Sequence, residues 1–164
     1  MSIVCVTHSV EETRTLGEAL ADVLEPGVVI ELIGGLGAGK TALAQGIAAG
    51  LGVTDRVTSP TFTMVASYEA ERRRDITTVL HADLYRVTSG IEADDLAIGE
   101  LVEDGAVALV EWGDVAPDVL GVNRLTVEIA VGNGDDDRII TLDSGGSSLE
   151  AGVLAAALTR WVSP

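Results

Sequence analysis

One glycine-rich segment restricts the fold of this chain more than any other feature. Residues 34–41 read Gly-Gly-Leu-Gly-Ala-Gly-Lys-Thr and match the pattern G-x-x-x-x-G-K-[ST] in full. An apolar, β-branched run at 28–33 precedes the segment, and good helix formers follow it at 39–51. A strand that enters such a turn and a helix that leaves it are the context that a phosphate-binding P-loop requires. The segment therefore predicts an α/β fold built around a nucleoside triphosphate site.

Each position of the segment has a chemical reason. The glycines let backbone N–H groups turn inward to phosphate oxygens, where a Cβ would collide, and the positive end of the following helix points at the same anions. Lys40 is predicted to neutralise the β- and γ-phosphates, and the Thr41 hydroxyl to hold Mg²⁺. A glycine-rich turn with an incidental lysine is the alternative. The predicted nucleotide-binding residues here are Gly35, Leu36, Gly37, Ala38, Gly39, Lys40, Thr41 and Ala42.

The hydrophobic pattern of the remaining chain predicts strands that alternate with helices. Capping-box spacing predicts helices that begin near Ser9 and near Ser147, and short helices suit the acidic stretch 92–104. We therefore expect one α/β domain over residues 1–164, a three-layer P-loop sandwich with a hairpin insertion whose exposed tip carries Arg72, Arg73 and Arg74. Apolar runs predict strands at 3–6, 28–33, 62–68, 76–81, 106–110, 124–131 and 138–142.

Two carboxylates follow apolar runs that are typical of buried strands. Glu111 closes the run 106–110, and Asp83 follows the run 78–82. A P-loop uses a carboxylate on a neighbouring strand to hold magnesium through water, so both side chains are candidates for that position. A solvated carboxylate at a strand end is the alternative for each of them.

The segment Ser59-Pro60-Thr61 begins 19 residues after Lys40. Other P-loop hydrolases have a mobile loop there, whose threonine senses the γ-phosphate and Mg²⁺. The same tripeptide is also ordinary turn chemistry, so the residues leave both interpretations of Thr61 open.

The formal net charge of −16 restricts the partners of the chain. A surface this acidic repels phosphate backbones, so tight direct binding of nucleic acid is disfavoured. A nucleotide is expected to bind only where local dipoles and a cation overcome this field. Lys40 is the single lysine of the chain, and its place in the P-loop pattern mildly supports that interpretation.

Cysteine content and hydropathy indicate the compartment. Cys5 is the only cysteine, so an internal disulfide is excluded and a reducing cytoplasm is the expected location. No apolar run approaches the ~18 residues of a membrane span, and residues 1–9 lack the features of a secretory signal. We expect a cytoplasmic protein without a membrane partner.

Four motifs together resemble the bacterial TsaE family. They are the P-loop, Ser59-Pro60-Thr61-Phe62-Thr63, His81-Ala82-Asp83-Leu84-Tyr85-Arg86 and Glu111-Trp112, and the resemblance covers residues 10 to 145. Members of the family are ATPases needed for the threonylcarbamoyladenosine modification at position 37 of tRNAs that read codons beginning with A. The resemblance implies a P-loop α/β sandwich with a central mixed, mainly parallel sheet, which agrees with the pattern above.

The resemblance implies roles for the matched residues. Thr41 and Glu111 correspond to the magnesium-binding pair, with Lys40 on the phosphates of ATP. Asp83 corresponds to the carboxylate required for hydrolysis, as a metal ligand or as the group that orients water. Thr61 is similar to the switch threonine of the family.

Other matched positions have two interpretations. The resemblance puts Trp112 at the rim of the nucleotide site, although a core position suits an aromatic residue equally well. His81, Tyr85 and Arg86 are implied to shape the site or contact a partner, or to be buried and structural. Adenine contacts do not follow from the sequence; residues 7–12 and the turn before Arg138 are plausible lining.

Two positions depart from the family pattern. The family often has Asp where this chain has Gly35, and Thr where it has Ala42. Neither position is the phosphate-binding lysine or the magnesium hydroxyl, so hydrolysis is compatible with both departures. The missing second hydroxyl beside Thr41 predicts modest nucleotide affinity.

The resemblance also implies partners. Family members bind a heterodimer of two related sugar-kinase-fold subunits, TsaB and TsaD, and their ATP turnover keeps that complex cycling, so contact with tRNA is indirect. The acidic charge fits this picture, because a partner with a basic face would attract the chain. Contact of Arg72, Arg73 and Arg74 with tRNA or a partner is the alternative to an exposed hairpin tip.

Three further functions share the P-loop. A small-molecule or nucleotide kinase needs an acceptor pocket and a lid with phosphate-binding arginines, for which only Arg72, Arg73 and Arg74 are candidates. A GTPase carries Asn-Lys-x-Asp after a strand, and Asn123-Arg124-Leu125-Thr126 does not match. A nucleotide-gated binding module with negligible turnover stays open, because P-loop hydrolases often need a partner to complete the site.

Overall fold

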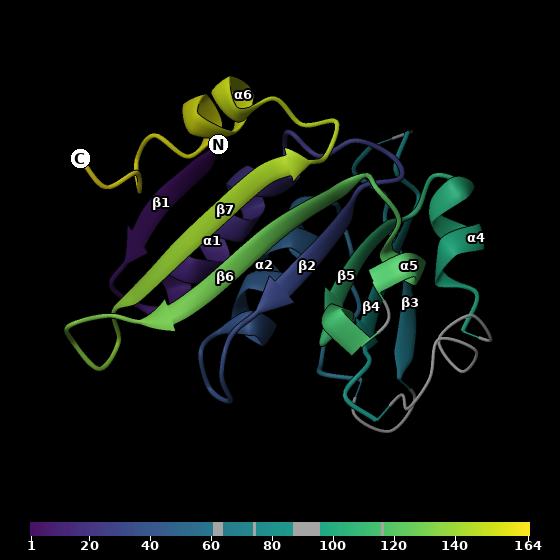
Figure 1. Ribbon diagram of the computed structural model, residues 1–164, viewed down its shortest axis with the longest axis horizontal. Helices are drawn as coiled ribbons and strands as arrows, with labels where there is room; N and C mark the ends of the chain where they lie inside the picture. The colour runs from purple at the N-terminus through teal and green to yellow at the C-terminus, as the bar shows by residue number, and fades with distance from the viewer. Residues whose placement is uncertain (61–63, 74, 87–95, 116) are drawn as a thin grey trace.

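The computed structural model describes residues 1–60, 64–73, 75–86, 96–115 and 117–164. Strands and helices alternate along the chain, as its hydrophobic pattern predicts (Figure 1). Among the described residues, no helix combines the length and the apolar character that a bilayer crossing needs. The elements are β1 (Ser2–Thr7), α1 (Val10–Ala21), β2 (Val29–Ile33), α2 (Lys40–Gly50), β3 (Val65–Glu69), β4 (Thr78–Asp83), α4 (Ile98–Glu103), β5 (Val107–Glu111), η1 (Gly113–Val115), α5 (Pro117–Leu120), β6 (Arg124–Val131), β7 (Arg138–Gly146) and α6 (Ala151–Ala157).

The described strands form one seven-stranded sheet in the order β1-β7-β6-β2-β5-β4-β3. The central strands β6, β2, β5 and β4 run parallel, whereas β7 and β1 on one side and β3 on the other pair antiparallel. Strands β3 and β4 form the predicted hairpin insertion. The expected mixed sheet with a parallel centre is therefore confirmed.

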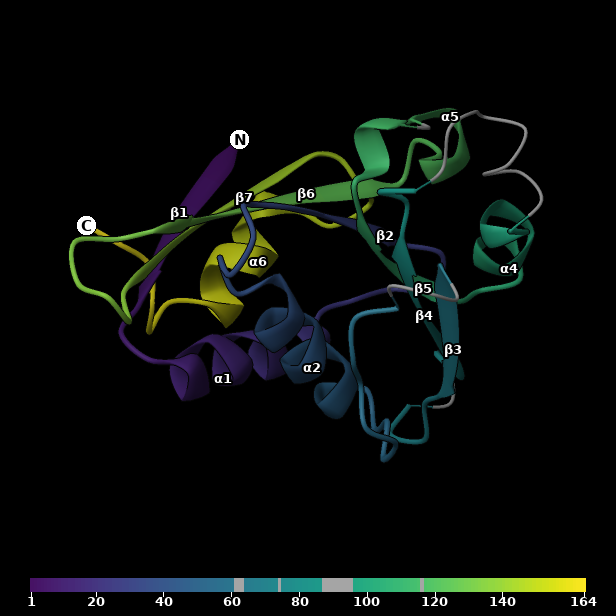
Figure 2. The same ribbon diagram turned by 90° about the horizontal axis from the view of Figure 1, so that it is seen from below.

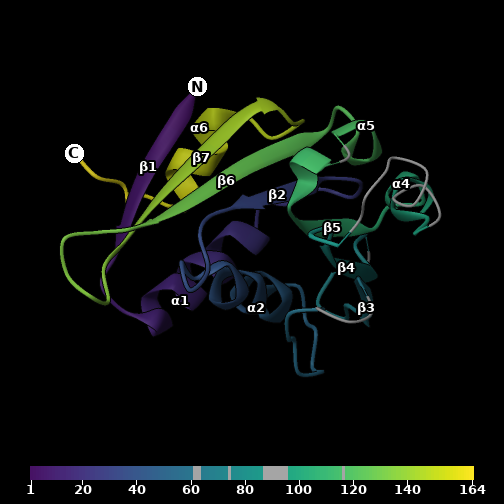
Figure 3. The ribbon, with the colours of Figure 1, turned by 60° about the horizontal axis from the view of Figure 1, so that its bottom comes forward.

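Helices cover the two faces of the sheet unequally (Figures 2 and 3). Helices α1, α2 and α6 lie over one face, and α4 and α5 lie on the other side, near β4 and β5. On β1, Ile3 and Cys5 are buried beneath the helices, whereas Val4 on the opposite face is 39% exposed. The three-layer arrangement therefore holds over the parallel centre, and the β1-β7-β6 side has two layers.

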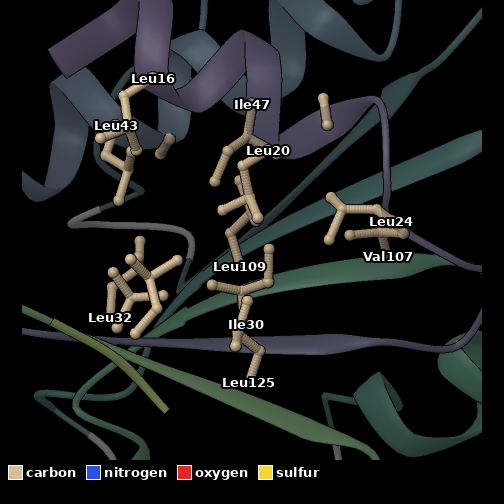
Figure 4. Packing of buried hydrophobic residues seen from close by; sticks show 14 of the residues in the cluster. Leu16, Leu20, Leu24, Ile30, Leu32, Leu43, Ile47, Val107, Leu109 and Leu125 are labelled. Atoms are coloured by element: carbon tan, nitrogen blue, oxygen red, sulfur yellow. The ribbon is translucent and has the colours of Figure 1, made fainter. Parts of the chain in front are cut away.

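Aliphatic side chains fill the larger core. Leu20 of α1 and Ile47 of α2 point at Ile30 and Leu109 in the middle of the sheet (Figure 4). Aromatic residues make up only 3% of the chain, so branched aliphatic residues have to fill this space. Because these side chains are small and interiors are close-packed, the two helices have to lie close to each other and to the sheet.

Glycines allow α1 and α2 to approach closely. A Cβ at Gly17 would lie 2.7 Å from the carbonyl oxygen of Leu43, and a Cβ at Gly46 would collide with the backbone of Arg14. Any larger residue at either position would push the helices apart. The contact fixes the position of α2, which carries the P-loop at its N-terminus.

The arginines of the β3–β4 connection bind the ends of these helices. Arg72 donates to the carbonyl of Gly50 at 3.0 Å, and Arg73 donates to the carbonyl of Leu24 at 2.5 Å. Cationic groups at helix C-termini satisfy free carbonyls and complement the helix dipole. The side chain of Arg72 is nevertheless 54% exposed, as expected for the tip, whereas that of Arg73 is 28% exposed. Arg74 lies outside the described residues.

Of the two predicted capping boxes, one is present. Ser9 caps α1 and accepts a hydrogen bond from the backbone N–H of Glu12 at 3.1 Å. The predicted helix start at Ser147 is wrong, because β7 continues to Gly146 and α6 begins at Ala151 without a side-chain cap. The hydroxyl of Ser148 instead donates to Glu25 at 2.7 Å.

Candidate nucleotide site

The carboxyl ends of three parallel strands meet at one edge of the sheet. Strand β2 runs into the P-loop, β5 ends at Glu111 and β4 ends at Asp83. In the strand register, Leu32 lies beside Glu111, and Glu111 lies beside Asp83. Ligands of open α/β sheets bind outside the carboxyl ends of the strands. The structure thus brings both candidate carboxylates to the edge at which the P-loop begins.

The P-loop backbone has a conformation that requires glycine. Gly37 and Gly39 have φ angles of 77° and 113°, in the left-handed region that other residues adopt only with strain. A Cβ at Gly34 would lie 2.7 Å from the carbonyl oxygen of Ile129 on β6. Arg138 supports the loop from outside by donating from Nε to the carbonyl of Ala38 at 2.8 Å.

The N-terminus of α2 lacks a side-chain cap. Its N-cap residue is Gly39, which makes no side-chain hydrogen bond to the helix, and its first turn contains no acidic residue. The first N–H groups of a helix have no partners inside the helix. Without a capping side chain they are available to an anion, and the helix dipole favours negative charge at the same point.

Lys40 lies between the P-loop and the end of β5. Its Nζ donates to the carbonyls of Gly34 and Gly35 at 2.6 and 3.1 Å. The same Nζ lies 4.0 Å from Oε1 of Glu111. The ammonium group is therefore held at the base of the site by hydrogen bonds and by a carboxylate.

A cavity of 810 Å³ opens over the loop, within the usual volume range of small-molecule sites. Asp83 lies in its wall and accepts from the backbone N–H of Tyr85 at 3.0 Å. Of the predicted nucleotide-binding residues, Ala42 alone is not among the described residues that line it. The lining consists of Gly35, Leu36, Gly37, Ala38, Gly39, Lys40, Thr41, Ser59, Asp83, Tyr85, Arg86, Glu111 and Trp112.

Trp112 lies at the rim of this cavity and not in the core. It is 45% exposed, and its ring centroid is 4.9 Å from that of Tyr85. Its φ angle of 60° is left-handed, which costs a non-glycine residue on the order of 1–2 kcal/mol. Backbone strain of this kind gathers at functional sites, and here it turns the residue after Glu111 out of the strand direction.

The predicted switch threonine, Thr61, lies outside the described residues. Ser59, two positions earlier, lines the cavity. The preceding segment is attached to α2, because Gln45 donates to the carbonyl of Val57 at 2.9 Å. The described part of this loop therefore reaches the same cavity as the P-loop.

Two buried polar side chains near the site were not assigned a definite role by the sequence. His81 on β4 is fully buried, and its Nε2 lies 3.0 Å from Oε2 of Glu111. Glu31 on β2 is 7% exposed and lies 3.5 Å from Nε of Arg124. The sequence contains one indication of a role for Glu31, because it is a charged residue within the otherwise apolar run 28–33.

A side-chain hydrogen bond joins the two segments proposed as adenine lining. Nδ1 of His8 lies 2.9 Å from Oδ1 of Asp137. This hydrogen bond raises the pKa of His8 and lowers the pKa of Asp137. Neither residue is among the described lining of the 810 Å³ cavity. The pair connects the start of α1 to the β6–β7 turn.

The oxygen donors fit a magnesium ion that arrives with a nucleotide. Thr41, Asp83 and Glu111 all line the cavity, and the described residues contain no group of three or more histidine, cysteine or acidic side chains placed to hold a metal ion. Nucleotide-bound Mg²⁺ takes one or two protein ligands and completes its octahedron with phosphate oxygens and water. The described donor set suits that mode of binding.

Comparisons with known proteins agree with these features. The family model described as "Threonylcarbamoyl adenosine biosynthesis protein TsaE" matches residues 7–140. The tRNA threonylcarbamoyladenosine biosynthesis protein TsaE of Bacillus subtilis (strain 168) is 38% identical over 154 residues, which cover 94% of this chain and 92% of that protein. The protein of the same name from Treponema pallidum (strain Nichols) is 36% identical over 138 residues, covering 84% and 98%.

The fold has a counterpart among solved structures. The crystal structure of Bacillus subtilus YdiB superposes with a TM-score of 0.75 and 32% sequence identity, over 98% of this chain and 95% of that one. The resemblance stated from the sequence motifs is therefore confirmed by sequence and by fold.

Proposed function

This chain belongs to the TsaE family, and from that membership we propose that it is a magnesium-dependent ATPase of tRNA threonylcarbamoyladenosine biosynthesis. Its ATP turnover supports a complex of TsaB- and TsaD-like subunits that modifies adenosine 37 of tRNA. One observation carries the proposal: a single cavity is lined by the P-loop, by Lys40 and by two strand-end carboxylates. This combination suits hydrolysis of a nucleoside triphosphate.

Phosphate binding is assigned to the loop and the start of α2. The N–H groups between Gly35 and Thr41 surround the phosphates, and the uncapped helix end adds its dipole. Lys40 exchanges its hydrogen bonds to Gly34 and Gly35 for phosphate oxygens. The ammonium group then no longer binds the carbonyls, and its positive charge interacts with the β- and γ-phosphates.

Hydrolysis is assigned to the residues around the γ-phosphate. Thr41 and Glu111 would hold Mg²⁺, and the ion would supply positive charge against the charge that develops on the phosphates. Asp83 orients the attacking water or contributes to the metal site, and Trp112 lies at the rim of the nucleotide site. Thr61 is assigned the sensing of the γ-phosphate as a proposal from the family pattern.

Charge and exposed apolar side chains support a protein partner. The net charge of −16 disfavours direct binding of tRNA. Leu36, Tyr85 and Trp112 are all exposed around the mouth of the cavity, and clustered apolar exposure is typical of interaction sites. A partner that covers the mouth would also exclude water from the site.

The kinase alternative lacks its candidate lid among the described residues. Arg72 and Arg73 bind the carbonyl groups of Gly50 and Leu24 at the ends of α2 and α1. Their guanidinium groups are committed to helix ends instead of phosphates. This weighs in favour of hydrolysis over transfer to a metabolite.

Phosphate release from ATP tests the proposal, with and without TsaB- and TsaD-like subunits. We expect Glu111→Ala to reduce the rate about 100-fold, because loss of one group that stabilises transition-state charge costs 10²–10³ in rate. Glu69→Ala is the matched control, since Glu69 is an exposed strand-end carboxylate on β3. Normal hydrolysis by Glu111→Ala would refute the magnesium assignment, and stoichiometric phosphate transfer to a metabolite would refute the ATPase proposal.

A further inference from the structure

A fully buried histidine contacts the proposed magnesium carboxylate from behind. His81 lies on β4 with an exposed fraction of 0%, and Glu111 at the end of β5 is 5% exposed. Nε2 of His81 and Oε2 of Glu111 are 3.0 Å apart. His81 is not among the described residues that line the nucleotide cavity, whereas Glu111 is. The histidine can therefore act on a bound nucleotide only through the glutamate.

The direction of this hydrogen bond follows from the chemistry of the two groups. A carboxylate only accepts, so Nε2 of His81 carries the proton and donates. The second ring nitrogen, Nδ1, is buried and has no hydrogen-bond partner among the described residues. An unsatisfied buried polar atom destabilises a fold. His81 is thus a poor residue for a purely structural position between the apolar Leu80 and Ala82.

The contact divides the two oxygens of Glu111 between different tasks. Oε2 is bound to His81, while Oε1 faces the P-loop, 4.0 Å from Nζ of Lys40. A glutamate side chain has several rotatable bonds, and fixing one of its oxygens removes most of that freedom. Oε1 is therefore directed at the phosphate side of the site before any ligand arrives.

We infer that His81 is a positioning residue that holds Glu111 in the orientation needed for the magnesium–nucleotide complex. The inference rests on the proposed function, because it takes Glu111 as the magnesium carboxylate. Groups that hydrogen-bond to a metal ligand fix its orientation, and their loss lowers metal affinity about 10–100-fold. His81 acts through Glu111 and does not touch the reacting atoms.

Two amide variants test whether a hydrogen-bond donor must reach Glu111 or whether any polar side chain at position 81 is sufficient. In His81→Gln, the amide nitrogen can occupy the place of Nε2 and still donate to Glu111. In His81→Asn, the amide ends near the place of Nδ1 and falls short. His81→Met removes the donor without burying a new amide, so it keeps the packing if the asparagine variant fails to fold.

The readout is binding of a fluorescent methylanthraniloyl ADP at increasing Mg²⁺ concentration. We expect His81→Asn and His81→Met to raise the Mg²⁺ concentration at half-saturation about 10-fold or more, with nucleotide binding in EDTA unchanged. His81→Gln should stay within about 3-fold of the wild type, as the retained donor implies. Val79→Ala changes a buried residue on the same face of β4, and should lower the melting temperature without moving the Mg²⁺ curve.

The outcomes distinguish this inference from the proposed function. If the wild-type chain binds the ADP probe equally well with and without Mg²⁺, Glu111 does not hold magnesium in that complex. The magnesium assignment of the proposed function then fails, and the inference falls with it. If the wild type depends on Mg²⁺ but His81→Met gives an unshifted curve, the inference alone is overturned. A shift in His81→Gln as large as that in His81→Asn would also overturn it, because the donor would then be irrelevant.

Discussion

Helices α1 and α2 pack against each other, yet their N-termini are completed in opposite ways. The start of α1 is closed by its own chain: Ser9 accepts from the N–H of Glu12, and the carboxylate of Glu12 accepts from the N–H of His8 at 2.7 Å. The start of α2 has Gly39 at the N-cap, no side-chain cap and no acidic residue in its first turn. The first residue of α2 is Lys40, whose side chain carries a positive charge.

This difference separates a structural helix end from a binding helix end. At α1, acidic groups and a hydroxyl satisfy the free N–H groups and neutralise the dipole. At α2, the same two sources of stability are missing, and a lysine adds further positive charge. The positive potential at α2 therefore stays available to an anion, and with glycine at the N-cap the lost capping energy is only about a few tenths of a kcal/mol.

The largest effect is expected from the binding end. Lys40→Ala should reduce ATP hydrolysis about 100-fold or more, because it removes the P-loop cation proposed to face the β- and γ-phosphates. Stability should change less than activity, since the contacts that the variant removes are two hydrogen bonds to the carbonyls of Gly34 and Gly35 and the 4.0 Å ion pair with Glu111. Phosphate release and urea denaturation of the same preparation would measure both quantities.

Lys40→Arg sharpens this prediction. A guanidinium keeps the charge but is planar and broad, and the space for Nζ is bounded by Gly34, Gly35 and Glu111. We expect hydrolysis to stay low in this variant. Full activity of Lys40→Arg would mean that charge alone, without a fitted geometry, supports the site.

The structural end should respond in the reverse manner. Ser9→Ala removes the cap of α1 and should lower the free energy of unfolding by about 1 kcal/mol. ATP hydrolysis should be unaffected, because Ser9 is not among the described residues that line the cavity. Ser9→Asp restores an acceptor and should recover the stability. A loss of activity in Ser9→Ala with unchanged stability would break the distinction between the two helix ends.

Local patterns predicted the parts of the site that lie within single segments. The strand, the P-loop and α2 are contiguous, so one motif reports all three. Glu111 and Asp83 each close an apolar run, and parallel strands put such ends at one edge. These predictions need no knowledge of which strand lies beside which.

Contacts between distant segments could not be predicted in the same way. The pairing of His81 with Glu111 depends on the register of β4 against β5. The binding of Arg72 and Arg73 to helix ends depends on how the hairpin connection folds back over α1 and α2. At Ser147 the capping pattern does not start a helix, because β7 extends to Gly146, past the predicted strand end at residue 142.

The smallest effect concerns a titratable contact at the structural end. His8 lies directly before the cap of α1, and its ring binds Asp137 of the β6–β7 turn at 2.9 Å. The hydrogen bond and the charge of Asp137 raise the pKa of His8 above its ordinary value of 6.5. Asp137 has a lowered pKa for the reciprocal reason, so its carboxylate stays ionised throughout the titration of His8.

A raised pKa in the folded state stabilises the protein while the histidine is protonated. The contribution of His8 is therefore complete below its unfolded pKa and is lost as the pH rises through its folded pKa. We expect the urea midpoints of wild type and His8→Gln to differ more at about pH 6 than at about pH 8.5. Equal differences at the two pH values would mean that protonation of His8 beside Asp137 does not contribute to the stability of the folded protein. Nucleotide affinity should not follow this titration, because neither His8 nor Asp137 is among the described residues that line the cavity.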